Sequence, residues 1–157
     1  MDQAEFIALI DKHQGIIHKI CRVYRNSKED REDLFQEIVF QLWKSAPSFE
    51  GKSQFSTWMY RVALSTAMAS YRKKKPEILY APSLPNTQTE QPETDEQRER
   101  LFAALAQLND SDKALITLYL EGLSYREIAA ITGITETNVG VKLSRIKTKI
   151  QQLLNIK

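Results

Sequence analysis

The sequence predicts an all-α protein with two small helical domains joined by a flexible acidic linker. Apolar residues recur at helical spacing in both halves of the 157-residue chain. Between the halves, residues 76–93 contain four prolines and no sustained periodicity, which is typical of a linker. We therefore expect one domain over 1–75 and a second over 94–157, each with a small core.

Composition and charge describe a folded chain with an uneven charge distribution. Hydrophobic residues make up 42% of the sequence and charged residues 27%. The net charge is +2, and two basic blocks (1–75 and 101–157) flank an acidic one (76–100). No apolar run reaches the ~18 residues of a membrane span, and the N-terminus lacks signal-peptide features. We expect a cytoplasmic protein without membrane insertion.

Few residues are candidates for catalysis or for binding a cofactor. Cys21 is the only cysteine and lies in an apolar helical stretch, which favours a small buried residue without a redox role. His13 and His18, without paired cysteines, do not have the spacing of a metal site. The sequence also lacks a phosphate-binding glycine loop and a nucleophile paired with a base. We therefore expect no cofactor, no metal and no enzymatic activity.

The first domain begins with two predicted helical segments. Residues 2–25 carry helix-spaced apolar side chains interrupted by Gly15, which fits either two short helices or one bent helix. After a polar break, Asp30 is expected to cap a helix that runs to about Ser45. One edge of that helix is polar and acidic and includes Asp33, Gln36 and Glu37. From physics alone, an ordinary solvated face explains this edge equally well.

A loop and a third helix follow. Pro47 is expected to end the second helix and to open a loop over 46–53, which contains Phe49 and Gly51. The next helix is predicted from about Gln54 to Lys74. It combines aromatic and basic side chains, which suits a nucleic-acid strand because cations follow phosphates and rings stack on unpaired bases. The alternative is that most of these rings belong to the core. The candidate residues are Phe55, Trp58, Arg61, Ser65 and Arg72.

The second domain is predicted to hold four helices. The first begins near Thr94 and breaks at Asn109, and the second runs from Ser111 as its N-cap to Glu121, with Gly122 ending it. The last two are predicted to form a helix-turn-helix motif.

Capping signals define that motif over 123–154. Ser124 and Glu127 have the spacing of a capping box, and Gly133 supplies the left-handed residue that ends the first helix. Thr135 is the next N-cap, and apolar residues then recur at steps of four and three along a helix over 135–154.

The face opposite that apolar stripe is small, polar and basic. It carries Thr137, Val141, Ser144, Arg145 and Thr148, and Asn138 and Gly140 are further candidates on the same helix. Short side chains let a helix approach the major groove, while Thr, Ser and Arg can bond to bases or phosphates. We interpret 135–154 as a DNA recognition helix. The alternative is a helical hairpin whose outer face is only solvated.

Together these blocks resemble the extracytoplasmic-function group of sigma factors in the sigma-70 family. Three stretches are similar to region 2 of that family. They are Asp33-Leu34-Phe35-Gln36-Glu37-Ile38 with Leu42-Trp43, then Phe49 and Gly51, and then residues 55–63 (FSTWMYRVA). Residues 123–129 (LSYREIA), followed by Val139, Leu143, Ser144 and Arg145, are similar to region 4. The resemblance implies a specificity subunit that recruits RNA polymerase to promoters and opens them.

The resemblance also implies partners and roles. Asp33, Gln36 and Glu37 would dock on the clamp helices of the largest polymerase subunit, and the flap of the second-largest subunit would be a further contact. The region 4 helix would read the minus-35 element as duplex, and an anti-sigma factor is an expected regulator. A flipped base of the non-template strand would be captured by Phe49, Glu50, Gly51, Lys52 and Ser53.

Two positions depart from the family pattern. Ser65 stands where the family usually has Asn, and Gly140 stands where it usually has Lys or Arg. Gly140 reduces helix propensity by about 1 kcal/mol, and the phosphate or base contact of the usual side chain is lost there, although glycine lets the backbone come closer. A stand-alone helix-turn-helix regulator is the alternative function. It would leave the acidic edge and the aromatic-basic block without a role.

Overall fold

The computed structural model describes residues 2–49, 51, 54–70 and 96–155, and in these ranges the regular structure is helical. The helices fall into two compact units. Unit 1 contains α1 (Gln3–Tyr24), α2 (Lys28–Ser45), a 3-10 turn η1 (Ala46–Ser48) and α3 (Phe55–Ser70). Unit 2 contains α4 (Glu96–Ala106), α5 (Asp110–Leu120), α6 (Tyr125–Thr132) and α7 (Glu136–Asn155). The prediction of an all-α fold is confirmed. The predicted linker over 76–93 lies outside the described residues, so the predicted domain boundaries stay predictions.

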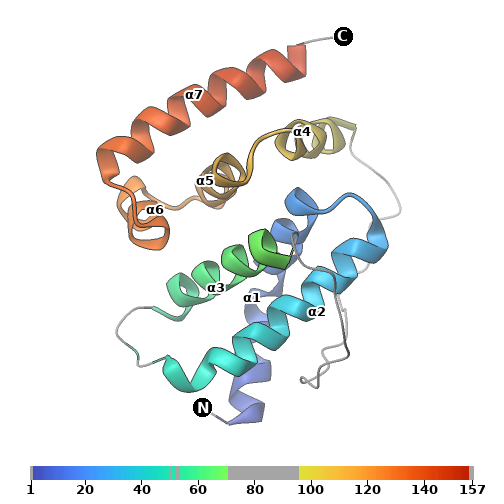
Figure 1. Ribbon diagram of the computed structural model, residues 1–157, viewed down its shortest axis with the longest axis vertical. Coiled ribbons are helices and arrows are strands. Elements are labelled where there is room, and N and C mark those ends of the chain that lie inside the picture. The colour runs from blue at the N-terminus through green and yellow to red at the C-terminus, as the bar shows by residue number, and fades with distance from the viewer. Residues whose placement is uncertain (1, 50, 52–53, 71–95, 156–157) are drawn as a thin grey trace. The chain divides into compact units, whose positions relative to one another are not determined.

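Unit 1 is a three-helix bundle in which α1 and α3 both pack against α2 (Figure 1). Its core consists of side chains with no exposed surface from all three helices: Phe6, Ile10, Ile17, Ile20, Ile38, Val39, Leu42, Met59, Ala63 and Ala67. The small residues of α3 let its backbone lie close to its neighbours. Near the start of α1 and the end of α2, the rings of Phe6 and Trp43 pack edge to face, with their centroids 5.0 Å apart. Each helix therefore buries one apolar stripe.

The first helix is continuous through Gly15, which decides between the two alternatives that the sequence left open. Asp2 caps it: the Asp2 carboxylate accepts from the Glu5 backbone N–H, and the Glu5 carboxylate accepts from the Asp2 N–H.

The prediction that Asp30 caps the second helix is wrong. Ser27 is the N-cap, and its Oγ accepts from the Asp30 N–H at 3.0 Å. Ser27 has the extended backbone of an N-cap residue, so the helix begins earlier and Asp30 lies in its first turn.

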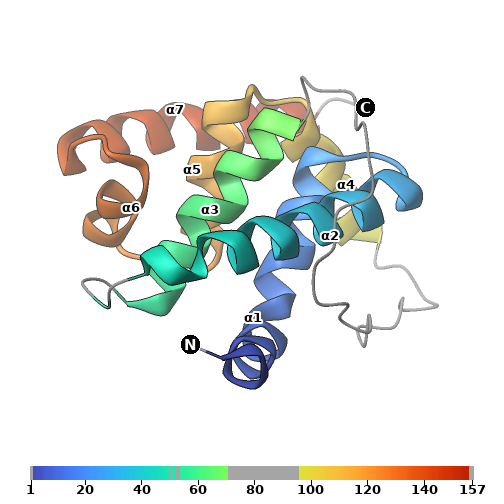
Figure 2. The same cartoon turned by 60° about the horizontal axis from the view of Figure 1, so that its bottom comes forward.

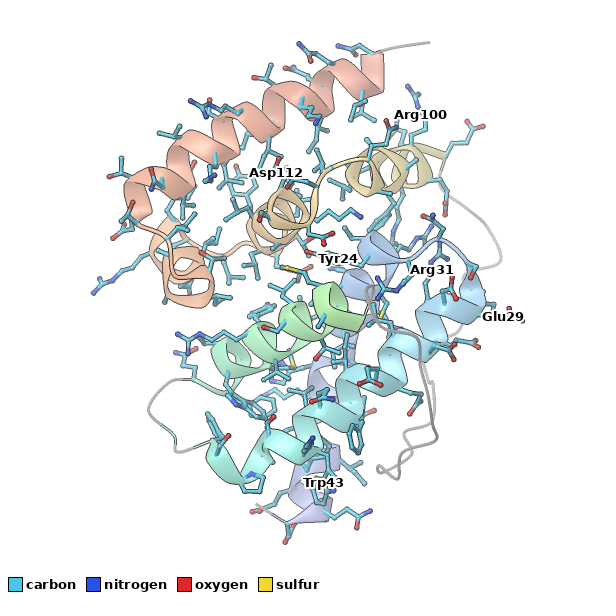
Figure 3. All side chains as sticks on the ribbon, in the orientation of Figure 1. Tyr24, Glu29, Arg31, Trp43, Arg100 and Asp112 are labelled. Atoms are coloured by element: carbon cyan, nitrogen blue, oxygen red, sulfur yellow. The ribbon has the colours of Figure 1, made fainter. Side chains whose placement is uncertain are left out.

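Two arginines stabilise the junction between α1 and α2. Arg25 donates from Nη1 to the Tyr24 carbonyl oxygen at 2.8 Å and from Nη2 to the Ala67 carbonyl oxygen of α3 at 3.1 Å. Arg31 donates to the carbonyl oxygens of Arg25 and Asn26. Figure 3 labels Arg31 and Tyr24 at this end of unit 1. Carbonyls at helix ends lack intrahelical donors, so these guanidinium groups supply the missing partners.

Unit 2 places the long helix α7 across α4, α5 and α6, as the views in Figures 1 and 2 show. Arg100 on α4 donates to the Leu154 carbonyl oxygen near the end of α7 at 2.9 Å (Figure 3). The core draws on every helix of the unit: Leu105, Leu108, Leu115, Leu118, Ile128, Val139, Leu143 and Ile146. The prediction that Ser111 caps α5 is wrong, because the Asn109 side chain accepts from the Asp112 N–H and α5 begins at Asp110.

Two further expectations need adjustment. Residues 46–48 form the 3-10 turn η1 rather than open loop, because Pro47 fits the first positions of a tight helical turn. The third helix begins at Phe55 and is described to Ser70, so the predicted stretch 71–74 lies outside the described residues.

Candidate nucleic-acid interface

Helices α6 and α7 form the predicted helix-turn-helix. Ser124 Oγ accepts from the Glu127 N–H at 3.1 Å, and Glu127 Oε1 accepts from the Ser124 N–H at 2.8 Å, which completes the capping box. Gly133 ends α6 in the left-handed conformation with φ 87°, where a side chain would be strained. Thr135 then caps α7, because its Oγ1 accepts from the Asn138 N–H at 3.1 Å. These local signals fix the turn between the two helices.

The apolar stripe of α7 is buried. Val139 and Leu143 have no exposed surface, Ile146 is 2% exposed and Ile150 is 9% exposed. Opposite this stripe, the side chains of Thr137, Val141, Ser144, Arg145 and Thr148 are all exposed, and we call these five residues the reading face. Thr148 Oγ1 also donates back to the Ser144 carbonyl oxygen. The predicted rotation of α7 therefore agrees with the structure, and what the reading face binds stays a prediction.

Asn138 and Gly140 differ in position from the reading face. Asn138 is exposed, whereas Gly140 is partly covered by Tyr125 of α6. A Cβ atom built on Gly140 would lie 3.3 Å from Cε2 of the Tyr125 ring. Gly140 thus lets α6 and α7 approach closely. From the sequence, Gly140 was expected only to let the backbone come closer where a phosphate or base contact is lost, and the Tyr125 ring beside it was not predicted.

Cationic side chains lie on and beside the reading face. Lys142, Arg145, Lys147 and Lys149 are all exposed on α7, whereas the same helix holds one acidic residue, Glu136. Such a surface attracts the phosphates of a duplex.

In unit 1, three aromatic rings meet where the loop after η1 returns to α3. Phe49 lies 5.8 Å from Phe55 and 5.2 Å from Trp58 between ring centroids, and Phe55 lies 5.4 Å from Trp58. All three side chains are half-buried, so they are neither free in solvent nor fully part of the core. His13 of α1 also lies against Phe55 at 5.5 Å. The loop is thus anchored by its aromatic residue.

The structure describes only some of the other residues of unit 1 that are predicted to contact the minus-10 strand. Arg61 and Ser65 are exposed one turn apart on α3, and Gly51 has φ 75°, the left-handed conformation that suits glycine in a turn. Arg72 and the loop residues Glu50, Lys52 and Ser53 lie outside the described residues.

The acidic edge of α2 is largely accessible. Asp33 and Gln36 are exposed, and Glu37 is half-buried and accepts a hydrogen bond from Gln41 at 3.1 Å. Glu29, Asp30 and Glu32 add exposed carboxylates to the first turns of this helix, and Figure 3 labels Glu29 there. This surface would suit a basic partner, while the carboxylates near the N-terminus of α2 also favour the helix dipole.

Of the residues with potential reactivity, Cys21 is buried and His18 is half-buried. Cys21 is 1% exposed, and burial raises its pKa to about 12, so at neutral pH it is an unreactive thiol. Burial also lowers the pKa of His18, whose ring stacks on Phe35 at 4.4 Å. In the described part of the chain, no three His, Cys, Asp or Glu side chains come together as a metal site. None of the described helices combines the length and apolar character needed to cross a membrane.

The geometry thus defines a two-unit helical protein with a helix-turn-helix in unit 2 and a three-helix bundle with an acidic edge in unit 1. Residues 9–77 match the family model for sigma-70 region 2, and residues 98–150 match the model for sigma-70 region 4. The ECF RNA polymerase sigma-E factor of Haemophilus influenzae is 31% identical, over 98% of this chain and 91% of its own length. The sigma-E factor of Escherichia coli K12 is 30% identical, over 98% and 90%. The chain belongs to the extracytoplasmic-function sigma factors of the sigma-70 family, which direct RNA polymerase to promoters.

Solved structures show the same fold. CnrH in complex with the cytosolic domain of CnrY has a TM-score of 0.71 and 20% identity, over 98% of this chain and 90% of that one. The sigma factor RpoE from Bartonella quintana, in complex with the anti-sigma factor NepR, has a TM-score of 0.64 and 19% identity, over 94% and 99%.

Sequence reasoning missed two contacts of α7: Tyr125 lies against Gly140, and Lys147 donates to Tyr119. The signal that was present is Gly140, because a glycine inside a regular helix often marks a close neighbour. Identifying that neighbour as Tyr125 required the crossing of α6 and α7.

Proposed function

We propose that this sigma factor recruits core RNA polymerase, reads the minus-35 element as duplex with α7, and holds the melted minus-10 strand with unit 1. The observation that carries the proposal is the reading face of α7, which is exposed, small and basic and is set on a rigid, capped helix-turn-helix. A helix of this kind can enter the major groove, where base pairs are distinguishable. The protein acts in the cytoplasm as a non-catalytic subunit.

Unit 1 supplies polymerase docking and strand opening. The acidic edge (Asp33, Gln36 and Glu37) docks on the clamp helices of the largest subunit, and unit 2 contacts the flap of the second-largest subunit. The loop over 49–53 takes up a flipped non-template base, with Phe49 anchoring the loop on Phe55 and Trp58. Arg61, Ser65 and Arg72 follow the single strand along α3 and beyond it. Unpairing a base requires a few kcal/mol, which a pocket with stacking and hydrogen-bonding groups can offset.

An anti-sigma factor regulates the protein. Support comes from the two solved neighbours, which are complexes with the cytosolic domain of CnrY and with the anti-sigma factor NepR. A stand-alone helix-turn-helix regulator is not favoured, because it would leave the match to sigma-70 region 2 over residues 9–77 without a purpose.

Run-off transcription tests the proposal. Core polymerase reconstituted with this chain should transcribe promoters selected from a random pool, whereas core alone should not. The Arg145→Ala variant should lose about 1 to 3 kcal/mol of promoter binding if Arg145 reads a base. Its circular dichroism melt should be unchanged, because Arg145 is exposed. Unchanged promoter affinity would show that Arg145 does not read DNA, and absence of selected transcription would refute the proposal.

A further inference from the structure

A cluster of three rings joins the two ends of the loop that precedes α3. Phe49, Phe55 and Trp58 make up this ring cluster. The rings of Phe49 and Phe55 are perpendicular, with centroids 5.8 Å apart, which is a favourable edge-to-face geometry. Phe49 follows η1, and Phe55 is the first residue of α3. Their contact therefore links the residue where the loop begins to the residue where it ends.

The chain on either side of the loop is attached to the core of unit 1. The Phe49 backbone N–H donates to the carbonyl oxygen of Ala46 at 3.0 Å, and the Ala46 side chain is buried. On the other side, Met59 lies one turn after Phe55 in α3 and has no exposed surface. The ring cluster itself is only half-buried. Its position therefore depends more than that of the core on each contact from a neighbouring helix.

His13 brings a ring of α1 against this cluster. Its imidazole lies 5.5 Å from Phe55 between ring centroids, with the two ring planes 33° apart, and its side chain is half-buried. The three rings of the cluster all come from residues 49–58, so contacts among them cannot fix where the cluster lies against α1. The contact with His13 does so, because α1 is anchored in the bundle by its own buried stripe.

We propose that His13 is a positioning residue for promoter opening: its ring holds Phe55 and, through Phe55, the ring of Phe49, so that both ends of the loop stay in place when an unpaired base arrives. This inference rests on the proposed function, in which that loop takes up a flipped base. The role assigned to His13 is to hold protein groups and not to contact DNA. A protein that must order its own groups while it captures a base has less binding energy left to offset the cost of unpairing.

His18 provides a matched control on the same helix. Its side chain is also half-buried, and its ring stacks on an aromatic ring of another helix, Phe35 of α2, at 4.4 Å. His18 lies five residues after His13, about 140° around α1, so it faces a different part of the bundle. Replacing either histidine removes a ring contact of α1, but the contact of His13 is the one that involves the ring cluster.

Promoter opening by reconstituted holoenzyme is the first test. The probe is a promoter duplex that the parent holoenzyme selects from a random pool, and permanganate reactivity of unpaired thymines measures opening at about pH 7.5. At that pH both histidines are largely neutral, because burial lowers the pKa of each below 6.5. His13→Gln should open about two- to tenfold less promoter, the change that one aromatic contact produces, while binding the closed duplex as the parent does.

Two further variants show whether the ring at position 13 causes the effect. His18→Gln should open the promoter as the parent does, although urea denaturation should show a destabilisation similar to that of His13→Gln. His13→Phe restores a ring against Phe55 and should restore opening. Equal opening by His13→Gln and the parent would overturn the inference, and so would an equal loss of opening in His18→Gln.

Fluorescence of Trp58 in the free chain is the second test. The chain has two tryptophans, so Trp43→Phe leaves Trp58 as the single fluorophore and keeps an aromatic ring against Phe6. In this background, His13→Gln should raise the acrylamide quenching constant of Trp58, and His18→Gln should leave it unchanged. An unchanged constant in His13→Gln would overturn the inference. A parent holoenzyme that opens no promoter would instead refute the proposed function, and the quenching comparison would still decide whether His13 holds the ring cluster.

Discussion

Phe49 connects a half-buried aromatic cluster of unit 1 to the loop that is proposed to hold DNA. Its ring touches both Phe55 and Trp58 and is half-buried, so truncation removes packing as well as any stacking on a base. Two roles fit this position: base capture, and an inward-facing anchor for the loop. The contacts with two rings of α3 favour the anchor, and neighbouring loop residues then supply the groups that meet the base.

A pair of substitutions at Phe49 separates the two roles. Phe49→Ala should lower the stability of unit 1 by about 1 to 3 kcal/mol, since a half-buried ring is lost, and should abolish promoter opening. Phe49→Leu retains an apolar anchor but cannot stack, so we expect it to retain opening. Permanganate reactivity of unpaired thymines measures opening, and tryptophan fluorescence measures stability. Loss of opening in Phe49→Leu with an unchanged melt would instead assign base stacking to Phe49.

His18 makes the stability of unit 1 depend on pH. Its ring stacks on Phe35, and burial lowers its pKa below the ordinary 6.5; burial, followed by the nearby Lys12, does the same for His13. The unfolded chain therefore binds more protons than the folded chain just below pH 6.5. By linkage, the free energy of unfolding should be greatest above that pH and should fall as the pH drops through the folded pKa values.

Urea denaturation at about pH 7.5 and about pH 5.5 checks this expectation. Both tryptophans, Trp43 and Trp58, belong to helices of unit 1, so tryptophan fluorescence reports on that unit. His18→Gln should reduce the difference between the two pH values, and His13→Gln should reduce it as well. A difference that is unaltered in the double variant would show that other groups cause the pH dependence.

At the scale of the element, α7 serves two purposes on opposite sides. One side supplies Val139, Leu143, Ile146 and Ile150 to the core of unit 2, and the other presents the reading face. The Ser124 capping box and Gly133 determine where the preceding helix begins and ends, and so fix how α7 leaves the turn. Recognition therefore depends on the packing of the same helix.

Substitutions two residues apart on α7 distinguish these sides. Leu143→Ala should destabilise unit 2 by about 2 to 5 kcal/mol, because Leu143 has no exposed surface and the unit is small. Val141→Ala is the matched control, because Val141 is 44% exposed and its truncation leaves no cavity. Circular dichroism melts measure both variants. If Leu143→Ala melts like the parent, or Val141→Ala unfolds more readily, the rotation assigned to α7 is wrong.

At the scale of the whole molecule, the two units present surfaces of opposite charge. Unit 1 presents an acidic edge on α2, and unit 2 presents a basic helix α7. The proposed function assigns the first surface to polymerase and the second to duplex DNA. Because the surfaces lie in separate compact units, a change in one should leave binding by the other intact.

Charge reversal tests this division. Asp33→Lys combined with Glu37→Lys should abolish co-purification with core polymerase, because a basic partner would meet two new positive charges. Glu96→Lys, at the exposed start of α4, is the control and should co-purify normally. The double variant should still unfold cooperatively by tryptophan fluorescence and should bind a selected minus-35 duplex as the parent does. Retained core binding in a folded double variant would assign the edge to solvation.

Local chemistry explains which features the sequence determined by itself. Helical periodicity predicted the buried stripe and the exposed face of α7, and Ser124, Glu127, Gly133 and Thr135 predicted the limits of the motif, because caps act within three or four residues. Where two capping residues competed, the sequence was insufficient. Ser27 and Asp30, or Asn109 and Ser111, are equally good N-caps by type, and only the backbone around them selects one.

Tertiary structure alone decided contacts between residues distant in the sequence. Three such contacts join different helices: the Tyr125 ring lies against Gly140, Lys147 donates to Tyr119, and Arg25 donates to Ala67. The sequence indicated two basic blocks, and the composition of α7 predicted a DNA-binding surface. Neither observation identifies the side chains of other helices that contact α7. The physical reason is that periodicity specifies only the face that a helix buries, whereas the packing of side chains between helices fixes the crossing that brings two faces together.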